Sequence, residues 1–233
     1  LFNIFEYRNF SPHRVGSWIS DIAVPETNNS DHKYTFYISG RHGGVWKTIN
    51  NGSSFEQIFD GYGTSSIGAI EVANSNPNTI WVGTGEASNA RSTHAGNGIY
   101  KSIDSGKTFK FMGLADSHHI PKIIIHPKNE NIIYVAVMGH LFSKNKMRGV
   151  FKSIDGGDSW KKVLYINQQT GVIDLVINRD NPNILYAATY DKIRYPWHLE
   201  AGGSNSGIYK SVDGGDNWDR LSGGLPYGNI GRI

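Results

Sequence analysis

Four copies of one glycine turn divide the chain into units of similar length, and this repetition constrains the fold more than any other feature. The copies share the core Ser/Thr-x-Asp/Asn-x-Gly-x-x-aromatic and occupy residues 44–55, 98–109, 149–160 and 207–218. Their central glycines are 54, 51 and 58 residues apart. A second motif, a Pro- or Asn-containing turn before a short apolar run, recurs at residues 76–81, 126–134 and 181–186. Two motifs that recur with one period indicate a repeat protein.

Each repeat predicts four short strands, as the third one illustrates. Its apolar runs, bounded by Gly, Pro, Asn or Asp, are residues 120–125, 132–138, 149–154 and 160–166. Helical spacing of apolar residues persists for three turns nowhere in the chain. Four-stranded antiparallel units with this period are typical of β-propeller blades, of which a ring has about 4 to 8. The sequence therefore predicts an all-β propeller.

The repeated core resembles the Asp-box of BNR-type propellers, whose pattern Ser-x-Asp-x-Gly-x-Ser/Thr-Trp is matched by Ser153 through Trp160. Essentially the whole chain resembles the N-terminal part of secreted bacterial BNR-repeat proteins of the sortilin-like or glycosyl-hydrolase kind. The resemblance implies a location outside the bacterial cell or on its surface. It also implies that ligands bind on the propeller face opposite the Asp-boxes.

The two ends of the chain suggest an incomplete ring. Residues 224–233 match residues 113–123, which open a blade, so they predict the first strand of a fifth blade. Residues 1–14 predict a closing strand, because residues 5–10 stand where an outermost strand would be. We therefore expect one incomplete domain, with residues 15–233 forming four blades and the start of a fifth. A closed four-bladed ring is the alternative.

The repeated acids and aromatics are expected to serve the fold. A short Asp or Asn accepts hydrogen bonds from the amides of its own turn, and the aromatic packs between blades. One acid per turn is too few for calcium, which takes about 6 to 8 oxygen ligands. These residues are Asn50, Asp104, Asp155, Asp213, Phe55, Phe109, Trp160 and Trp218.

The loops that break the repeat lie on the opposite face, between the second and third strands of each blade and between blades. Function concentrates in such loops, although simple drift in loop length is an equal alternative for any one of them. The proposed ligand-binding residues are Arg41, His42, Glu86, Arg91, His94, His140, Arg194, Tyr195, Trp197 and His198. The same loops also contain Lys144, Arg148, Glu200, Asp60, Tyr62, Asp116, His118, His119, Asn167, Gln168 and Tyr227.

The segment Tyr195-Pro196-Trp197-His198 is the most informative of these loops. Its flat aromatics lie next to Arg194 and Glu200, a combination that suits stacking on a sugar ring or on an aromatic peptide side chain. The preferred alternative for Trp197 is an indole that folds back over the base of its own loop.

No complete catalytic set is present, so the catalytic residues are unknown and enzymatic activity is left open. Common glycosidases need two carboxylates. In the xyloglucan-cleaving family that the chain resembles, a catalytic Asp precedes a Gly-Gly pair, and Arg41 stands about there in this sequence. Glu86 is the one carboxylate placed where it could act, and an ion pair with Arg91 is its expected role. Sialidases need an arginine triad and a Tyr nucleophile, and this sequence has no Arg-Ile-Pro element.

A histidine metal site is the other catalytic possibility, because the chain has nine His. Neighbouring blades could bring His42, His94, His140, His198 and the pair at residues 118–119 to one rim. No closely spaced pair such as His-x-x-x-His occurs, so scattered structural histidines are favoured. We expect neither a metal nor a cofactor.

Composition narrows the choice of partner. The chain has no Cys, a net charge of +3 and no apolar run near the length of about 20 residues that spans a membrane. These values favour neither a nucleic-acid partner nor a membrane span. The predicted function is that of an extracellular binding or scaffold propeller that recognises a glycan or a protein. The other predicted partner is the remaining propeller segment of the same protein. The alternative is part of a glycoside hydrolase whose site is completed by that segment.

Overall fold

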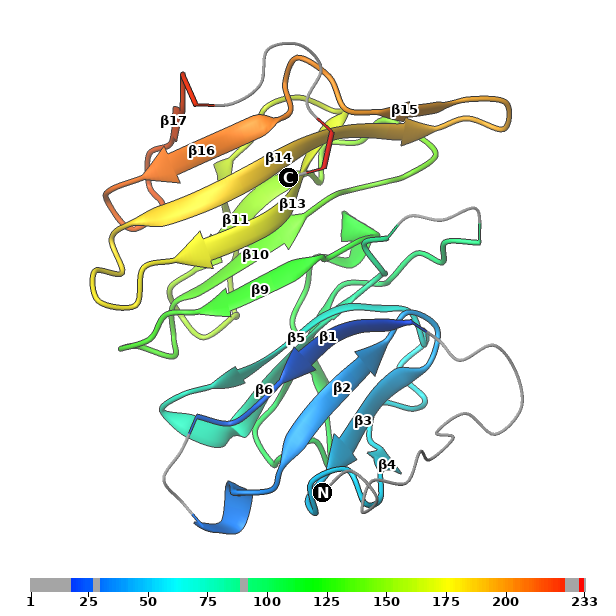
Figure 1. The fold of residues 1–233 in the computed structure, drawn as a ribbon, viewed down its shortest axis with the longest axis vertical. Helices are drawn as coiled ribbons and strands as arrows, with labels where there is room; N and C mark the ends of the chain where they lie inside the picture. Colours follow the sequence, from blue (N-terminus) through cyan, green and yellow to red (C-terminus); the bar gives the residue numbers. More distant parts are fainter. Residues whose placement is uncertain (1–17, 27–29, 89–91, 225–230, 233) are drawn as a thin grey trace, which may run out of the picture.

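The computed structural model describes residues 18–26, 30–88, 92–224 and 231–232, and it is built almost entirely of antiparallel strands (Figure 1). The strands form four sheets that are arranged as the blades of a β-propeller. The predicted all-β propeller fold is therefore confirmed. The predicted closing strand, residues 1–14, and most of the predicted fifth-blade strand lie outside the described residues.

Each blade takes its four strands in sequence order. Blade 1 contains β1 (Ile19–Ala23), β2 (Phe36–Gly40), β3 (Gly44–Thr48) and β4 (Glu56–Gln57). Blade 2 contains β5 (Ile67–Ala73), β6 (Asn76–Thr84), β7 (Ile99–Ser102) and β8 (Lys110–Phe111). Blade 3 contains β9 (Lys122–Ile125), β10 (Ile133–Val137), β11 (Gly149–Ser153) and β12 (Lys161–Leu164). Blade 4 contains β13 (Thr170–Ile177), β14 (Leu185–Arg194), β16 (Gly207–Ser211) and β17 (Asp219–Arg220).

Two short 3-10 helices, η2 (Ser30–His32) and η3 (Ala115–Ser117), complete the regular structure together with β15 (Leu199–Ala201), which pairs with the end of β14. Among the described residues, no helix is both long and apolar enough to cross a membrane.

The blades pack face to face, and a single strand contributes to two cores. In β10, Ile133, Val135 and Val137 join the core shared with blade 2. The alternate residues Tyr134 and Ala136 join the core shared with blade 4. A strand that is buried on both faces needs a continuous apolar run, which is the pattern found in this sequence. The innermost strands β1, β5, β9 and β13 lie side by side in this order.

The four repeated turns (residues 48–55, 102–109, 153–160 and 211–218) share one hydrogen-bond pattern. Asp104 accepts from the Thr108 amide at 2.9 Å and from the Ser102 hydroxyl at 2.7 Å. Hydrogen bonds lower the pKa of Asp104 to about 2, and the largest contribution comes from the Thr108 hydroxyl. Asp155 and Asp213 make equivalent bonds, and Asn50 accepts from the Ser54 amide at 2.9 Å.

The repeated turns and the turns between first and second strands lie on the same face, as antiparallel topology predicts. The Gly156 amide donates to the Asn131 carbonyl at 2.9 Å, and the Gly214 amide donates to the Asn183 carbonyl at the same distance. We call this side of the propeller the turn face. The opposite side, where β2–β3, β6–β7, β10–β11 and β14–β16 are connected, is the loop face, on the right in Figure 1.

Two sequence expectations about turns and loops are wrong in detail. The expected turn at residues 76–78 is the beginning of β6, and the turn precedes it at residues 74–75. The segment that follows Asp191 was expected to be a long loop between the second and third strands. It forms a β-hairpin instead, because β14 continues to Arg194 and β15 pairs with it.

Candidate functional site

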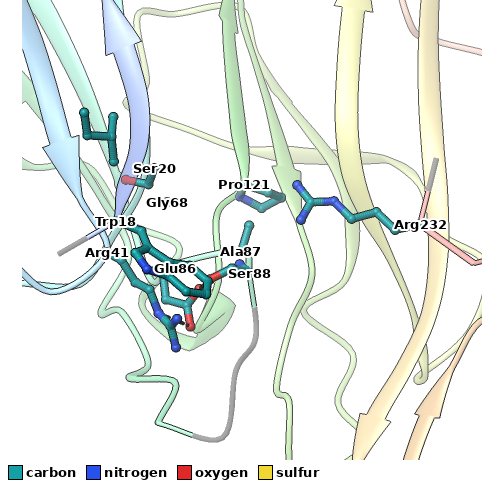
Figure 2. Close-up of a pocket in the computed structure, with 10 residues that line it drawn as sticks. Trp18, Ser20, Arg41, Gly68, Glu86, Ala87, Ser88, Pro121 and Arg232 are labelled. Atoms are coloured by element: carbon teal, nitrogen blue, oxygen red, sulfur yellow. Dashed lines mark hydrogen bonds and ion pairs between the residues drawn. The ribbon is translucent and has the colours of Figure 1, made fainter. Parts of the chain in front are cut away.

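A cavity of about 200 Å³ opens on the loop face where blades 1 and 2 meet (Figure 2). Arg41 comes from the β2–β3 loop, whereas Glu86 and Ser88 come from the loop that follows β6. Trp18 precedes β1 and borders the cavity, which also reaches Arg232 near the C-terminal end. The site therefore combines segments that lie far apart in the sequence.

Arg41 and Glu86 form a buried ion pair in this cavity. Arg41 Nε lies 3.3 Å from Glu86 Oε1, and the side chains are 8% and 1% exposed. The Arg41 guanidinium also lies over the Trp18 ring, 4.9 Å from its centre. Glu86 accepts further hydrogen bonds from the Ser88 amide at 2.7 Å and from the Thr93 hydroxyl at 2.5 Å. The Glu86 carboxylate is thus enclosed by charged and polar partners, with little of its surface open to a ligand.

The expected partner of Glu86, Arg91, lies outside the described residues, so that ion pair stays a prediction. The structure adds Arg41 as a partner. A pair 45 positions apart in sequence has no local pattern that reveals it, and only the packing of blade 1 on blade 2 brings the two side chains together.

His119 lies next to Glu86 and is almost fully buried. Its Nδ1 lies 3.0 Å from the carbonyl oxygen of Glu86. Burial lowers the pKa of His119 to about 4, so the imidazole is neutral at physiological pH. On the surface nearby, His42 and His94 make an edge-to-face contact with ring centres 4.8 Å apart. Burial and the charge of Arg41 lower the pKa of His42.

Asp116, His118 and His140 converge one blade further along. The rings of His118 and His140 stack at 3.6 Å between centres, and His140 Nε2 lies 2.7 Å from Asp116 Oδ1. His118 follows η3 in the connection between blades 2 and 3, whereas His140 follows β10. The sequence spacing that favoured scattered histidines therefore missed this cluster, because its members come from two different loops.

Arg148 belongs to the framework of the loop face rather than to a ligand-contacting surface. It is fully buried and donates to the carbonyls of Met138, at 2.6 Å, and Gln169, at 2.9 Å. It also donates to Asn145 Oδ1 at 3.1 Å and to the carbonyl of His140. Burial lowers the pKa of Arg148 to about 10. Arg148 was expected among the loop residues of this face, and the structure shows that it is buried there.

A second cavity of about 500 Å³ lies on the loop face between blades 3 and 4. Its lining is polar and consists of Lys144, Asn167, Gln168, Gln169, Asp191 and Asn205. Asp191 is held by the Thr170 hydroxyl and by the Asn205 amide, which donates at 3.1 Å. Gln169 donates to Glu200 on β15 at 2.5 Å, which connects this cavity to the hairpin.

The hairpin between β14 and β15 presents two aromatic rings at its tip. The Tyr195 amide donates to the His198 carbonyl at 2.7 Å, so Pro196 and Trp197 form the turn itself. The Tyr195 and Trp197 rings lie nearly parallel, with centres 5.9 Å apart. Trp197 is 83% exposed, so the expectation that it folds back over its loop is wrong. His198 is exposed as well, whereas Arg194 is half-buried and its amide donates to Leu141.

The structure thus distributes the predicted residues over three places. Arg41 and Glu86 lie in the first cavity, with His42 and His94 beside it; His140 lies in the histidine cluster; the remaining described residues lie on or next to the hairpin. The cavity residues that no sequence motif indicated are Trp18, Gln169, Asp191 and Asn205. Asp191 and Asn205 lie in the longest break of the repeat, which is the signal that could have identified them.

No protein-family model matches the sequence, and no curated protein matches it. Similar solved structures include an ancestral GH74 enzyme, with a TM-score of 0.66 and 24% identity over 90% of this chain and 25% of that one. The GH74 xyloglucanase from Xanthomonas campestris has a TM-score of 0.64 and 15% identity over 91% of this chain and 31% of that one.

A third similar structure is the extracellular domain of a B. thetaiotaomicron protein described as a hybrid two-component system. It has a TM-score of 0.60 and 12% identity over 97% of this chain and 24% of that one. The chain therefore spans about a quarter to a third of the length of these proteins. At these identities, the similarity establishes the propeller fold.

Proposed function

We propose that this chain is the ligand-binding part of an extracellular BNR-type propeller, and that it binds a carbohydrate chain across its loop face. The repeated turns support the resemblance to Asp-box propellers, since each has a carboxylate or amide that accepts hydrogen bonds from its own turn. The similar structures support a carbohydrate-related role outside the cell, because they include a xyloglucanase and an extracellular domain.

The aromatic tip of the hairpin is the observation that carries the proposal. An indole that is 83% exposed is costly in water, and its stacking on Tyr195 holds it in place. The C–H faces of a pyranose ring pack well on such a flat apolar surface, because stacking buries a large area with few bonds to immobilise. Pro196 restricts the backbone of the turn, so little conformational entropy is lost when a ligand binds.

The neighbouring polar cavity supplies the groups that sugar hydroxyls need. A hydroxyl donates one hydrogen bond and accepts others, and carboxamides such as those of Asn167, Gln168 and Asn205 can do both. Glu200 on β15 joins the hairpin to this cavity through Gln169. A chain of several sugars can therefore lie from the aromatic tip into the cavity between blades 3 and 4.

Binding without cleavage fits the described residues better than hydrolysis. Glu86 is the carboxylate in the first cavity, and it is 1% exposed and ion-paired with Arg41. Glycosidases of the common kind place two carboxyl groups about 5 to 9.5 Å apart on either side of the bond that is cleaved. Hydrolysis by a longer protein that contains this chain is the second candidate, and the similar GH74 structures favour it.

The test is calorimetric titration of the chain with soluble xyloglucan and with an unbranched β-glucan. We expect Trp197→Ala to weaken binding about fivefold or more, since an aromatic stacking contact contributes about 1 kcal/mol or more. Tyr34→Ala is the matched control, because Tyr34 is 54% exposed but lies on the turn face. The control should bind like the parent.

Equal binding by the parent and Trp197→Ala would contradict the proposed site. The absence of binding to both polysaccharides would contradict carbohydrate as the ligand class. Release of reducing ends in the same samples would show that the polysaccharide is hydrolysed, and would support the second candidate function instead of binding alone.

A further inference from the structure

We infer that Asp116, His118 and His140 form a binding site for a divalent transition-metal ion of the zinc class. One ligand atom from each of these residues lies within 4.8 Å of the other two. Two imidazole nitrogens and one carboxylate oxygen form a donor set that zinc accepts, and zinc sites with an open position commonly have three protein ligands. The site stands independently of the proposed carbohydrate binding.

The donor atoms lie close to the spacing of a metal site, and the two stacked rings must turn so that the in-plane lone pair of each Nε2 points at the ion. His140 Nε2 and His118 Nε2 lie 2.7 and 3.8 Å from Asp116 Oδ1. In a tetrahedral zinc site with bonds of about 2.0 to 2.1 Å, the ligand atoms are about 3.3 to 3.5 Å apart. The first distance therefore lengthens and the second shortens, each by less than about 1 Å, when an ion enters between the three atoms.

The backbone is bent at His118 in a way that places its ring against His140. His118 has φ 55° and ψ −42°, and the His119 amide donates to the Ser117 carbonyl at 2.6 Å. This is a γ-turn with a positive φ at a residue other than glycine, a rare and strained conformation. Such strain persists only where the surrounding structure enforces it, and it is often found at functional sites.

The surrounding residues orient His140 as a metal ligand. Its Nδ1 lies 3.0 Å from the Ser143 hydroxyl, and its backbone amide donates to Asn145 Oδ1 at 3.1 Å. Asn145 also donates to the Asp116 carbonyl at 3.4 Å, and Arg148 Nε donates to Asn145 Oδ1. A polar group on the second ring nitrogen can hold the tautomer in which Nε2 binds a metal, and the ion then comes between Nε2 and Asp116 Oδ1, which contact each other directly in the structure.

The exposure of the ligands gives the ion an open side. The side chains of Asp116, His118 and His140 are 61%, 35% and 21% exposed. An ion bound here completes its shell with water or with an oxygen atom of a ligand. It also connects the loop between blades 2 and 3 with the loop between β10 and β11, which stabilises the loop face.

The test is a calorimetric titration of the untagged chain with Zn²⁺, accompanied by the visible spectrum of the Co²⁺-loaded chain. We expect one ion per chain and the intense absorption bands of four-coordinate Co²⁺. Asp116→Asn and His118→Asn should each weaken binding by about tenfold or more. Asn tolerates positive φ better than most residues, so the second variant removes the ring while keeping the turn.

Two further variants separate a metal site from adventitious binding. Ser143→Ala keeps all three ligands and should weaken Zn²⁺ binding by about tenfold, because it removes the group that orients His140. His198→Ala removes an exposed histidine on the same face and should bind Zn²⁺ like the parent. Equal Zn²⁺ affinity in the parent, Asp116→Asn and His118→Asn would overturn the inference, as would the absence of binding to the parent.

Discussion

At the scale of single residues, His119 makes the free energy of unfolding depend on pH, because its pKa is about 4 in the folded chain. An exposed histidine in the unfolded chain has a pKa of about 6.5. Between these two values the unfolded state binds more protons, so the free energy of unfolding falls as the pH falls from 6.5 to 4. The full loss is about 3 kcal/mol, from about 1.4 kcal/mol per pKa unit.

We expect His119→Gln to remove this contribution, because Gln presents an amide to the Glu86 carbonyl without titrating. Urea unfolding of both proteins at several pH values between 7.5 and 4.5 measures it. The stability of the parent should fall more steeply with acid than that of the variant. His198→Gln is the control and should follow the parent. Parallel curves for the parent and His119→Gln would show that His119 titrates normally.

The limits of sequence reasoning are clearest for individual side chains. The role of Asp104 in its turn could be predicted, since its bonds are to residues two and four positions away. The pairing of Arg41 with Glu86 could not, because it depends on how two blades pack. Burial of Arg148 was also hidden, because a loop arginine that binds carbonyl groups has the same local sequence as one that points into solvent.

At the scale of strands and turns, the repeated turns pack against the neighbouring blades, and Gly157 shows how close this packing is. Gly157 has φ +97°, and a Cβ there would lie 2.3 Å from Cη2 of Trp81, which belongs to β6 of blade 2. The Trp160 ring of the same turn meets Trp81 edge to face, with centres 6.2 Å apart. The turn of blade 3 is therefore part of the core that it shares with blade 2.

We expect Gly157→Ala to lower the free energy of unfolding by about 3 kcal/mol or more, since it combines backbone strain with a clash in a packed core. Gly223→Ala separates the two effects. Gly223 has φ +92° and open space around it, so that variant should lose only about 1 kcal/mol. Chemical unfolding measures both changes. Equal losses in the two variants would mean that Trp81 moves aside and that the close fit contributes little.

Strands were easier to predict than the loops between them. The apolar runs of blade 3 marked β9 to β12 to within a few residues, and the signal is strongest in β9, β10 and β11, which are almost entirely buried. The hairpin of β14 and β15 was missed because β15 has only three residues, which is too short for an apolar alternation to be recognised.

At the scale of the whole molecule, the order of the blades follows from the sequence repeat, since each unit of similar length folds into one sheet and packs on the next. The assembly of the loop face does not follow from it. The two cavities and the histidine cluster combine loops from different blades, and their positions depend on how the blades pack. Sequence could identify the face that carries the site, but not the side chains that meet there.

The most direct test of carbohydrate binding on the loop face is hydrogen–deuterium exchange of the chain with and without xyloglucan. We predict slower exchange in the loops at residues 138–148, 167–169 and 194–205. Exchange in the repeated turns at residues 48–55, 102–109, 153–160 and 211–218 should stay unchanged. Protection confined to the repeated turns, or no protection at a polysaccharide concentration that saturates binding, would contradict the assignment of the loop face.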